Sequence, residues 1–271
     1  MNKPEKLVKF IKKKDKMMNL YDVHTHIQDL RLTTSRDDII TRGLKAGVRG
    51  IMCCGTCEGD WDGVVEMTEK YEPVRASFGI HPWFISNRSS DWIDKLESQL
   101  RMYPRAGVGE IGLDRMISQR DDKDQERVFA EQLKLSNKLR RPVSIHCRNA
   151  WGVMPDIIKK NGGLPFGGVI HSWSGSAEMV TVFEQLGASI SFSGSVTRAN
   201  NKKAHHACQS VSRDRLLIET DSPDIIPDGV DADLNEPAFV MAVLETVARL
   251  RGDTVEDVAQ YTWENALRVF G

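Results

Sequence analysis

The chain has 271 residues, of which 40% are hydrophobic and 28% charged. This is enough apolar material for a large core and too much for a disordered protein. Lys and Arg (37) balance Asp and Glu (38) to a net charge of -1, which excludes a global positive field that attracts nucleic acid. No apolar run approaches the roughly 18 residues of a membrane-spanning helix, and no apolar secretory signal opens the chain. We therefore expect a soluble cytoplasmic protein that makes no membrane contact.

Residues 1–18 differ from the rest in charge. Seven lysines stand against Glu5 and Asp15, a local charge of +5. The few apolar residues of this segment allow one short amphipathic turn that docks on the body or touches an anionic surface, but a solvated tail is the favoured interpretation. We predict a lysine-rich N-terminal extension here.

From residue 19 onwards, short β-rich runs alternate with helical patterns. Strands are predicted at 20–23, 48–53, 74–80, 106–111, 143–146, 169–171, 188–192 and 216–220. Helical patterns between them include 37–45, 61–71, 92–102, 125–139 and 177–186. Long crossovers indicate parallel pairing. Because no glycine-rich dinucleotide motif follows the first strand, we predict an α/β protein with a single (β/α)8 TIM-type barrel over residues 19–271, closed by helices at 236–250 and 255–270.

The five cysteines form no metal or redox motif. Their odd number is typical of free thiols in a reducing compartment. Cys54 and Cys57 make a lone C-x-x-C, whereas a zinc ribbon needs a second pair and a redox motif needs a thioredoxin context. We interpret them as small buried residues at the end of a strand.

The first strand runs into D-V-H-T-H, with His24 and His26 two residues apart. Side chains alternate faces along a strand, so both imidazoles point the same way. A single histidine is more often a core residue than a ligand, but a pair at this spacing favours metal binding.

Further polar residues end later strands in the same manner. They are Glu110, His146, His171 and Asp221. Active sites of barrel enzymes lie at the carboxyl ends of the strands, where these side chains meet. Six ligands exceed the needs of one tetrahedral ion, so we predict two divalent ions about 3.5 to 4 Å apart, with Glu110 as the bridging carboxylate.

With these residues in place, the sequence resembles the TatD family of metal-dependent hydrolases, amidohydrolase-like barrels usually described as deoxyribonucleases. The resemblance covers residues 20–271 and rests on seven motifs. They are D-V-H-T-H, G-I-H-P at 79–82, G-E-I-G-L-D at 109–114, I-H-C-R-N-A at 145–150, H-S-W-S-G at 171–175, E-T-D-S-P at 219–223 and N-E-P at 235–237. The resemblance implies the same six metal ligands and Mg, Mn or Zn as the ions.

Three more residues belong near this site. His81 is expected to contact a substrate phosphate, the alternative being a strand cap. Glu219 shares the face of Asp221 and is expected to support a ligand, the alternative being a proton acceptor. Arg148 is equally suited to a forked bond to phosphate and to a salt bridge on the rim. The remaining pair, His205 and His206, follows polar residues, is predicted to face solvent and is given no role.

The sequence also departs from the family. Arg115 follows G-L-D where a tyrosine is common, and four aspartates occupy the loop before N-E-P, which commonly carries an arginine-glycine pair. They are Asp224, Asp228, Asp231 and Asp233. Unless this loop turns outward or binds cations, it would repel a long polyanion.

Together these features predict a metal-dependent hydrolase of phosphodiester bonds, a deoxyribonuclease or exonuclease with DNA as its partner. Asp221 is expected to accept the proton of the attacking water, with Glu110 holding the metals. One alternative is an amidohydrolase-type enzyme for a small amide or lactone, because fold does not determine which bond is cleaved. Another is a metal-stabilised binding protein that contacts an anionic partner through its lysine-rich extension.

Overall fold

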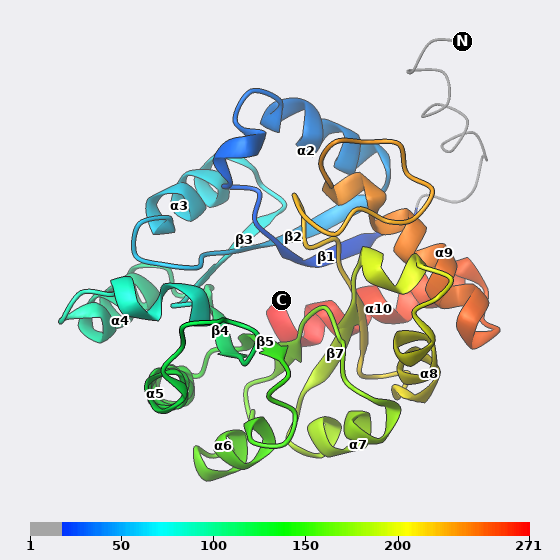
Figure 1. The fold of residues 1–271 in the computed structure, drawn as a ribbon. Coiled ribbons are helices and arrows are strands. Elements are labelled where there is room, and N and C mark those ends of the chain that lie inside the picture. Colours follow the sequence, from blue (N-terminus) through cyan, green and yellow to red (C-terminus); the bar gives the residue numbers. More distant parts are fainter. Residues whose placement is uncertain (1–17) are drawn as a thin grey trace.

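The computed structural model describes residues 18–271, so most of the predicted lysine-rich extension, residues 1–17, lies outside the described residues. Eight parallel strands form one sheet in sequential order around a barrel (Figure 1). They are β1 (Leu20–Thr25), β2 (Val48–Cys54), β3 (Val74–Phe78), β4 (Gly107–Asp114), β5 (Val143–Arg148), β6 (Gly168–Ile170), β7 (Ser189–Phe192) and β8 (Leu216–Ile218). The predicted fold is confirmed.

The barrel is nearly closed, because β1 and β8 meet only at the ends where their chains leave the sheet. Thr25 and Ser222 form an isolated parallel bridge. The His26 amide donates to the Ser222 carbonyl at 2.7 Å, and the Asp221 amide donates to the His24 carbonyl at 3.0 Å. These bonds fix two predicted ligands, His26 and Asp221, next to each other.

Helices surround the sheet, as the amphipathic patterns of the sequence predict. They are α2 (Arg36–Lys45), α3 (Trp61–Lys70), α4 (Trp92–Met102), α5 (Asp122–Leu139), α6 (Met154–Lys160), α7 (Ala177–Gln185), α8 (Lys202–Ser210), α9 (Val240–Arg251) and α10 (Val255–Phe270). Their buried stripes pack on the outer face of the strands and bury apolar area, which stabilises the fold by about 25 cal/mol per Å².

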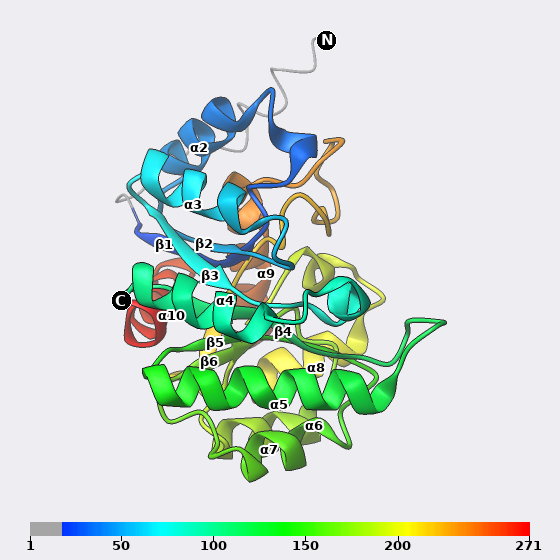
Figure 2. The same ribbon diagram turned by 90° about the vertical axis from the view of Figure 1, so that its left-hand side faces the viewer.

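The last helix, α10, closes the end of the barrel opposite the loops that follow the strands (Figure 2). Ala266 and Phe270 of α10 pack with Tyr21, Val23 and Leu217 in a second apolar cluster. This apolar cluster fills the end of the barrel next to α10, so the polar side chains lie at the opposite end, where the strands end. In the part of the chain that the structure describes, no helix is long and apolar enough to span a bilayer.

One prediction about the helices is wrong. His205 does not face solvent: it is buried in α8, and its Nε2 lies 3.0 Å from the Val196 carbonyl oxygen. The turn over Gly194–Thr197 covers it, a tertiary contact that the polar sequence around it does not indicate. His206 is exposed, as predicted.

Candidate metal centre

The six residues predicted to bind metal converge at the carboxyl ends of the strands. Glu110 is at the centre and is almost fully buried. Its Oε1 lies 2.8 Å from His171 Nε2 and 3.0 Å from His146 Nδ1. Its Oε2 lies 3.3 Å from His26 Nε2 and 3.4 Å from His24 Nε2. Each carboxylate oxygen therefore faces different histidines, and Oε1 also lies 3.2 Å from His81 Nε2.

Asp221 completes the half of the cluster that contains His24 and His26. Its Oδ1 lies 3.7 Å from His26 Nε2 and 3.9 Å from His24 Nε2. Asp221 has a left-handed backbone with φ 59°, a conformation that aspartate tolerates better than most residues. The chain turns between Ile218, the last residue of β8, and Asp221, which brings this carboxylate next to β1.

The hydrogen-bond partner of His26 indicates which of its ring nitrogens is free to bind a cation. His26 Nδ1 lies 2.8 Å from the Cys54 carbonyl oxygen, which only accepts, so this nitrogen carries the hydrogen. The Nε2 lone pair of the neutral ring then points at Glu110 Oε2 and at His24 Nε2, 3.3 Å away. Lone pairs and carboxylate oxygens repel one another unless positive charge lies among them. Imidazole and carboxylate are suitable ligands for Zn, Mn or Mg.

The electrostatics of the protein alone agree with this need for positive charge. Burial lowers the pKa of His26, but hydrogen bonding and charge from Glu110 outweigh it and raise the pKa to about 9. Burial alone would raise the pKa of Glu110, whereas the histidines around it hold it well below its usual range. Without metal, protons take the place of a cation.

His81 lies in the cluster but differs from the other histidines. Its Nδ1 accepts the Trp83 backbone N–H at 3.1 Å, where it caps the 3-10 helix η2 (Pro82–Asn87). Its Nε2 therefore carries the hydrogen and donates to Glu110 Oε1 at 3.2 Å. Burial lowers the pKa of His81 to about 4, which keeps the ring neutral. In this arrangement His81 is a donor and has no free lone pair for a metal.

Glu219, two residues before Asp221, lies beside one of the histidines. It is fully buried and accepts the Ser172 amide at 2.7 Å and the Ser191 hydroxyl. The same Oε1 lies 3.4 Å from His171 Nδ1. The expectation that this carboxylate supports His171 as a ligand stays a prediction.

Asp114 is a site residue that the sequence reasoning missed. Its Oδ2 lies 3.2 Å from His146 Nε2 and accepts the Trp83 indole N–H at 2.7 Å. Its Oδ1 accepts the Met116 amide at 2.7 Å. Burial opposes ionisation, but the bonds from His146, Trp83 and Met116 lower the pKa of Asp114 below its ordinary value. The signal was its position four residues after Glu110, which on a strand is the same face.

Arg148 and the aspartates of the loop before N-E-P lie outside the cluster. Arg148 is exposed at the end of β5, and its guanidinium forms no ion pair within residues 18–271. Asp224 is neutralised by Arg31 at 2.9 Å, and Asp228, Asp231 and Asp233 are exposed. The loop therefore turns its charges outward. This is one of the two conditions, beside binding cations, under which we expect it not to repel a polyanion.

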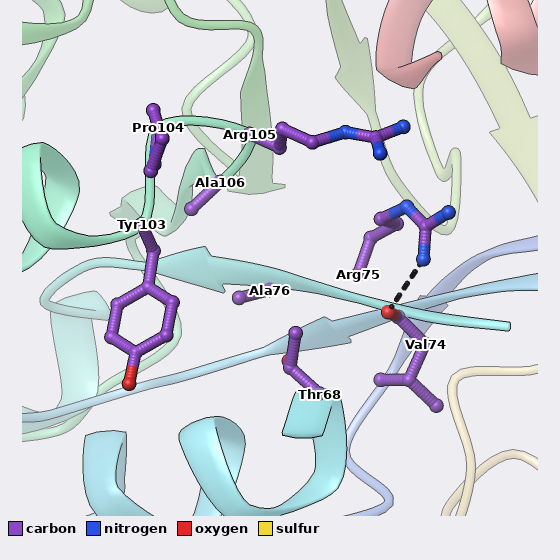
Figure 3. A pocket seen from close by; sticks show the side chains of 8 residues that line it. All are labelled: Thr68, Val74, Arg75, Ala76, Tyr103, Pro104, Arg105 and Ala106. Carbon is purple, nitrogen blue, oxygen red and sulfur yellow. Dashed lines mark hydrogen bonds between the residues drawn. The ribbon is translucent and has the colours of Figure 1, made fainter. Parts of the chain in front are cut away.

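A separate cavity of about 230 Å³ lies away from this cluster (Figure 3). Its walls come from the start of β3, at Val74, Arg75 and Ala76, and from the segment Tyr103 to Ala106 before β4. This is the amino-terminal end of the strands, so a ligand of the cluster cannot occupy it.

A parallel barrel with histidines and carboxylates at the carboxyl ends of its strands is the architecture of barrel-fold metal-dependent hydrolases. The family described as TatD related DNase matches residues 21–271, and the chain belongs to this TatD family. The chain is 32% identical over 254 residues to the uncharacterized metal-dependent hydrolase YabD of Bacillus subtilis, covering 93% of this chain and 98% of that protein.

Two further relatives extend the comparison. The chain is 27% identical over 257 residues to a protein of Citrobacter koseri named 3'-5' ssDNA/RNA exonuclease TatD, covering 93% of this chain and 99% of that protein. The crystal structure of the TatD homolog YjjV from Escherichia coli superposes with a TM-score of 0.89 at 28% identity, covering 94% of this chain and 99% of that one. The resemblance predicted from the motifs is confirmed, and the protein is a metal-dependent hydrolase of this family.

Proposed function

We propose that this hydrolase holds two divalent ions and cleaves phosphodiester bonds in nucleic acid. The observation that carries the proposal is the division of Glu110: Oε2 faces His24 and His26, and Oε1 faces His146 and His171. One ion would be held by His24, His26, Asp221 and Glu110 Oε2. The other would be held by Glu110 Oε1, His146 and His171. The imidazoles of both sites favour Zn, whereas the carboxylates also suit Mn or Mg.

Two divalent ions at such a site lower the pKa of a bound water towards about 7 and neutralise charge that develops on phosphoryl oxygens. The residues of the chain do the rest. Asp221 keeps 13% of its side-chain surface exposed, so it stands where a water can reach the cluster and is the group that accepts the water's proton. Glu219 orients His171 through its Nδ1, and Asp114 orients His146 through its Nε2.

Two cationic or donor groups are available to the phosphate. The exposed Arg148 lies two residues beyond His146 and suits a forked pair of bonds to phosphate oxygens. His81 presents its N–H inside the cluster and would shift this bond from Glu110 to a substrate oxygen.

The choice of nucleic acid as substrate draws support from the name of the Citrobacter relative and from the outward orientation of the acidic loop. The test is a substrate panel of single-stranded DNA, duplex DNA, RNA, a small phosphodiester, an amide and a lactone. Metal-stripped protein is reloaded with one metal at a time. Metal-dependent cleavage of an oligonucleotide is expected. Cleavage of the amide or lactone alone would replace this proposal with the amidohydrolase alternative.

A further inference from the structure

Two large apolar side chains lie exposed beside the metal centre. Trp83 follows β3 and is 55% exposed, and Met116 follows β4 and is also 55% exposed. Single exposed apolar residues are common on proteins. These two are notable because both are bonded to the carboxylate of Asp114, and the loop that carries Met116 projects beyond the barrel end (Figure 2).

Trp83 is held in place by one bond from its indole and one from its backbone. Its ring N–H donates to Asp114 Oδ2 at 2.7 Å, and its backbone N–H donates to His81 Nδ1 at 3.1 Å. The His81 ring stands edge-on to it, with ring centroids 5.1 Å apart and an interplanar angle of 88°. The single polar atom of the indole is therefore satisfied, and about half of the side chain stays open to solvent in a fixed orientation.

Met116 is held in a similar way. Its amide donates to Asp114 Oδ1 at 2.7 Å, and its sulfur accepts Asn149 Nδ2 at 2.9 Å. Asp114 Oδ2 also lies 3.2 Å from His146 Nε2, so one carboxylate joins the Trp83 indole and the Met116 backbone to a proposed metal ligand. The indole of Trp83 therefore lies beside His81 and is linked through Asp114 to His146.

From this arrangement we propose that Trp83, flanked by Met116, is a stacking platform for one nucleobase of a single-stranded nucleic acid, next to the phosphate that is cleaved. The inference rests on the proposed function, because it assigns the substrate of the same site. Stacking on an aromatic ring is tolerant of sequence and requires a base that is already unpaired. An ordered side chain loses little conformational entropy when the base binds.

The test compares a short oligothymidylate with the same strand carrying an abasic sugar at each position in turn. Phosphorothioate linkages prevent cleavage, and fluorescence anisotropy in manganese gives the Kd. We expect the wild type to bind about 5-fold to 100-fold more weakly when one particular base is absent. Trp83→Ala should bind the complete and the abasic strands equally. Trp83→Phe, which keeps a ring but loses the bond to Asp114, should retain most of the preference.

Met116→Ala should reduce the preference, whereas Met102→Ala should keep it, because Met102 is an exposed apolar residue at the far end of α4. The inference would be overturned if Trp83→Ala raised the Kd of the complete and the abasic strands by the same factor, so that the base preference was kept. Trp83 would then act only through Asp114. Equal losses in Trp83→Phe and Trp83→Ala, or no base preference in the wild type, would also overturn it. If the wild type cleaves no oligonucleotide, the proposed function fails; if it cleaves them and Trp83→Ala keeps the base preference, only this inference fails.

Discussion

The imidazole rings of His24 and His171 stack face to face, with centroids 3.8 Å apart and planes 9° apart. They come from β1 and from the residue after β6, and each reaches a different oxygen of Glu110. Two stacked rings that both carried a proton would repel each other. Burial first, and then the charge of His171, lowers the pKa of His24, so His24 remains available as a neutral ligand.

His171→Ala should lower the metal content from two ions per chain to about one. The substitution removes one of the two imidazoles that are proposed to hold an ion together with Glu110 Oε1, and it leaves His24 and His26 intact. Elemental analysis after reloading and gel filtration measures the content. His206→Ala, at an exposed histidine of α8, is the matched control and should keep both ions. An unchanged content in His171→Ala would contradict the division of ligands between two ions.

Metal should bind more tightly as the pH rises towards 9. Burial lowers the pKa of His26, but Glu110 raises it to about 9 overall, so below this pH an ion must displace the proton from Nε2. The Kd for the ion that His26 binds should fall by about tenfold per pH unit and level off above pH 9. Calorimetric titration in buffers of different ionisation enthalpy should detect the released proton. A Kd that is constant between pH 7 and 9 would show that His26 is already unprotonated.

The barrel could be predicted from the sequence because short apolar, strand-forming runs recur along the chain and several of the crossovers between them carry an amphipathic pattern. The site could be predicted for a related reason. In a parallel barrel all strand ends share one face, so His146 and His171 had to lie near His24 whatever the exact pairing. The exact boundaries differ in every strand, by one to three residues at one or both ends. The predicted strand 169–171, for example, ends at Ile170, shortly before Ser172 turns into the left-handed region with φ 43°.

The contacts between loops could not be predicted in this way. The bond from Trp83 to Asp114 joins the segment after β3 to the end of β4, and nothing in either segment specifies the distance between them. The burial of His205 depends likewise on the carbonyl of Val196, which the chain brings over α8 from outside the helix. Periodicity indicates which face of an element is buried, but it does not indicate which loop covers it.

One of the five cysteines should react with a thiol reagent in the native protein. Cys53, Cys54, Cys147 and Cys208 are buried, and burial raises the pKa of Cys208 to about 12, so little reactive thiolate forms. Cys57 is partly exposed and lies beyond the end of β2, so the prediction that it is a buried residue at the strand end is wrong. Ellman's reagent should titrate about one thiol in the folded protein and five after denaturation, and none in folded Cys57→Ser. Rapid reaction of several native thiols would contradict the interpretation of these cysteines as inert core residues.

Asp221→Asn should lower turnover by at least about 100-fold, the loss typical of an absent general base. The amide keeps the size of the side chain and cannot take a proton from water. It also removes an anionic ligand from the half of the cluster formed with His24 and His26, so one ion should bind more weakly. Turnover is therefore measured at saturating manganese, which compensates for weaker binding and leaves the proton transfer as the difference.

The matched control is Asp228→Asn, which removes an exposed carboxylate from the loop that follows Asp221 and should leave turnover unchanged. Folding should survive both substitutions. The backbone N–H of residue 221 keeps its bond to the His24 carbonyl, and Asp228 lies at the surface. Melting temperatures measured with metal check this. If Asp221→Asn retained activity within about threefold of the wild type, the barrier would differ by less than about 0.7 kcal/mol. Asp221 would then be a replaceable ligand, and the proton would have to leave the water by another route.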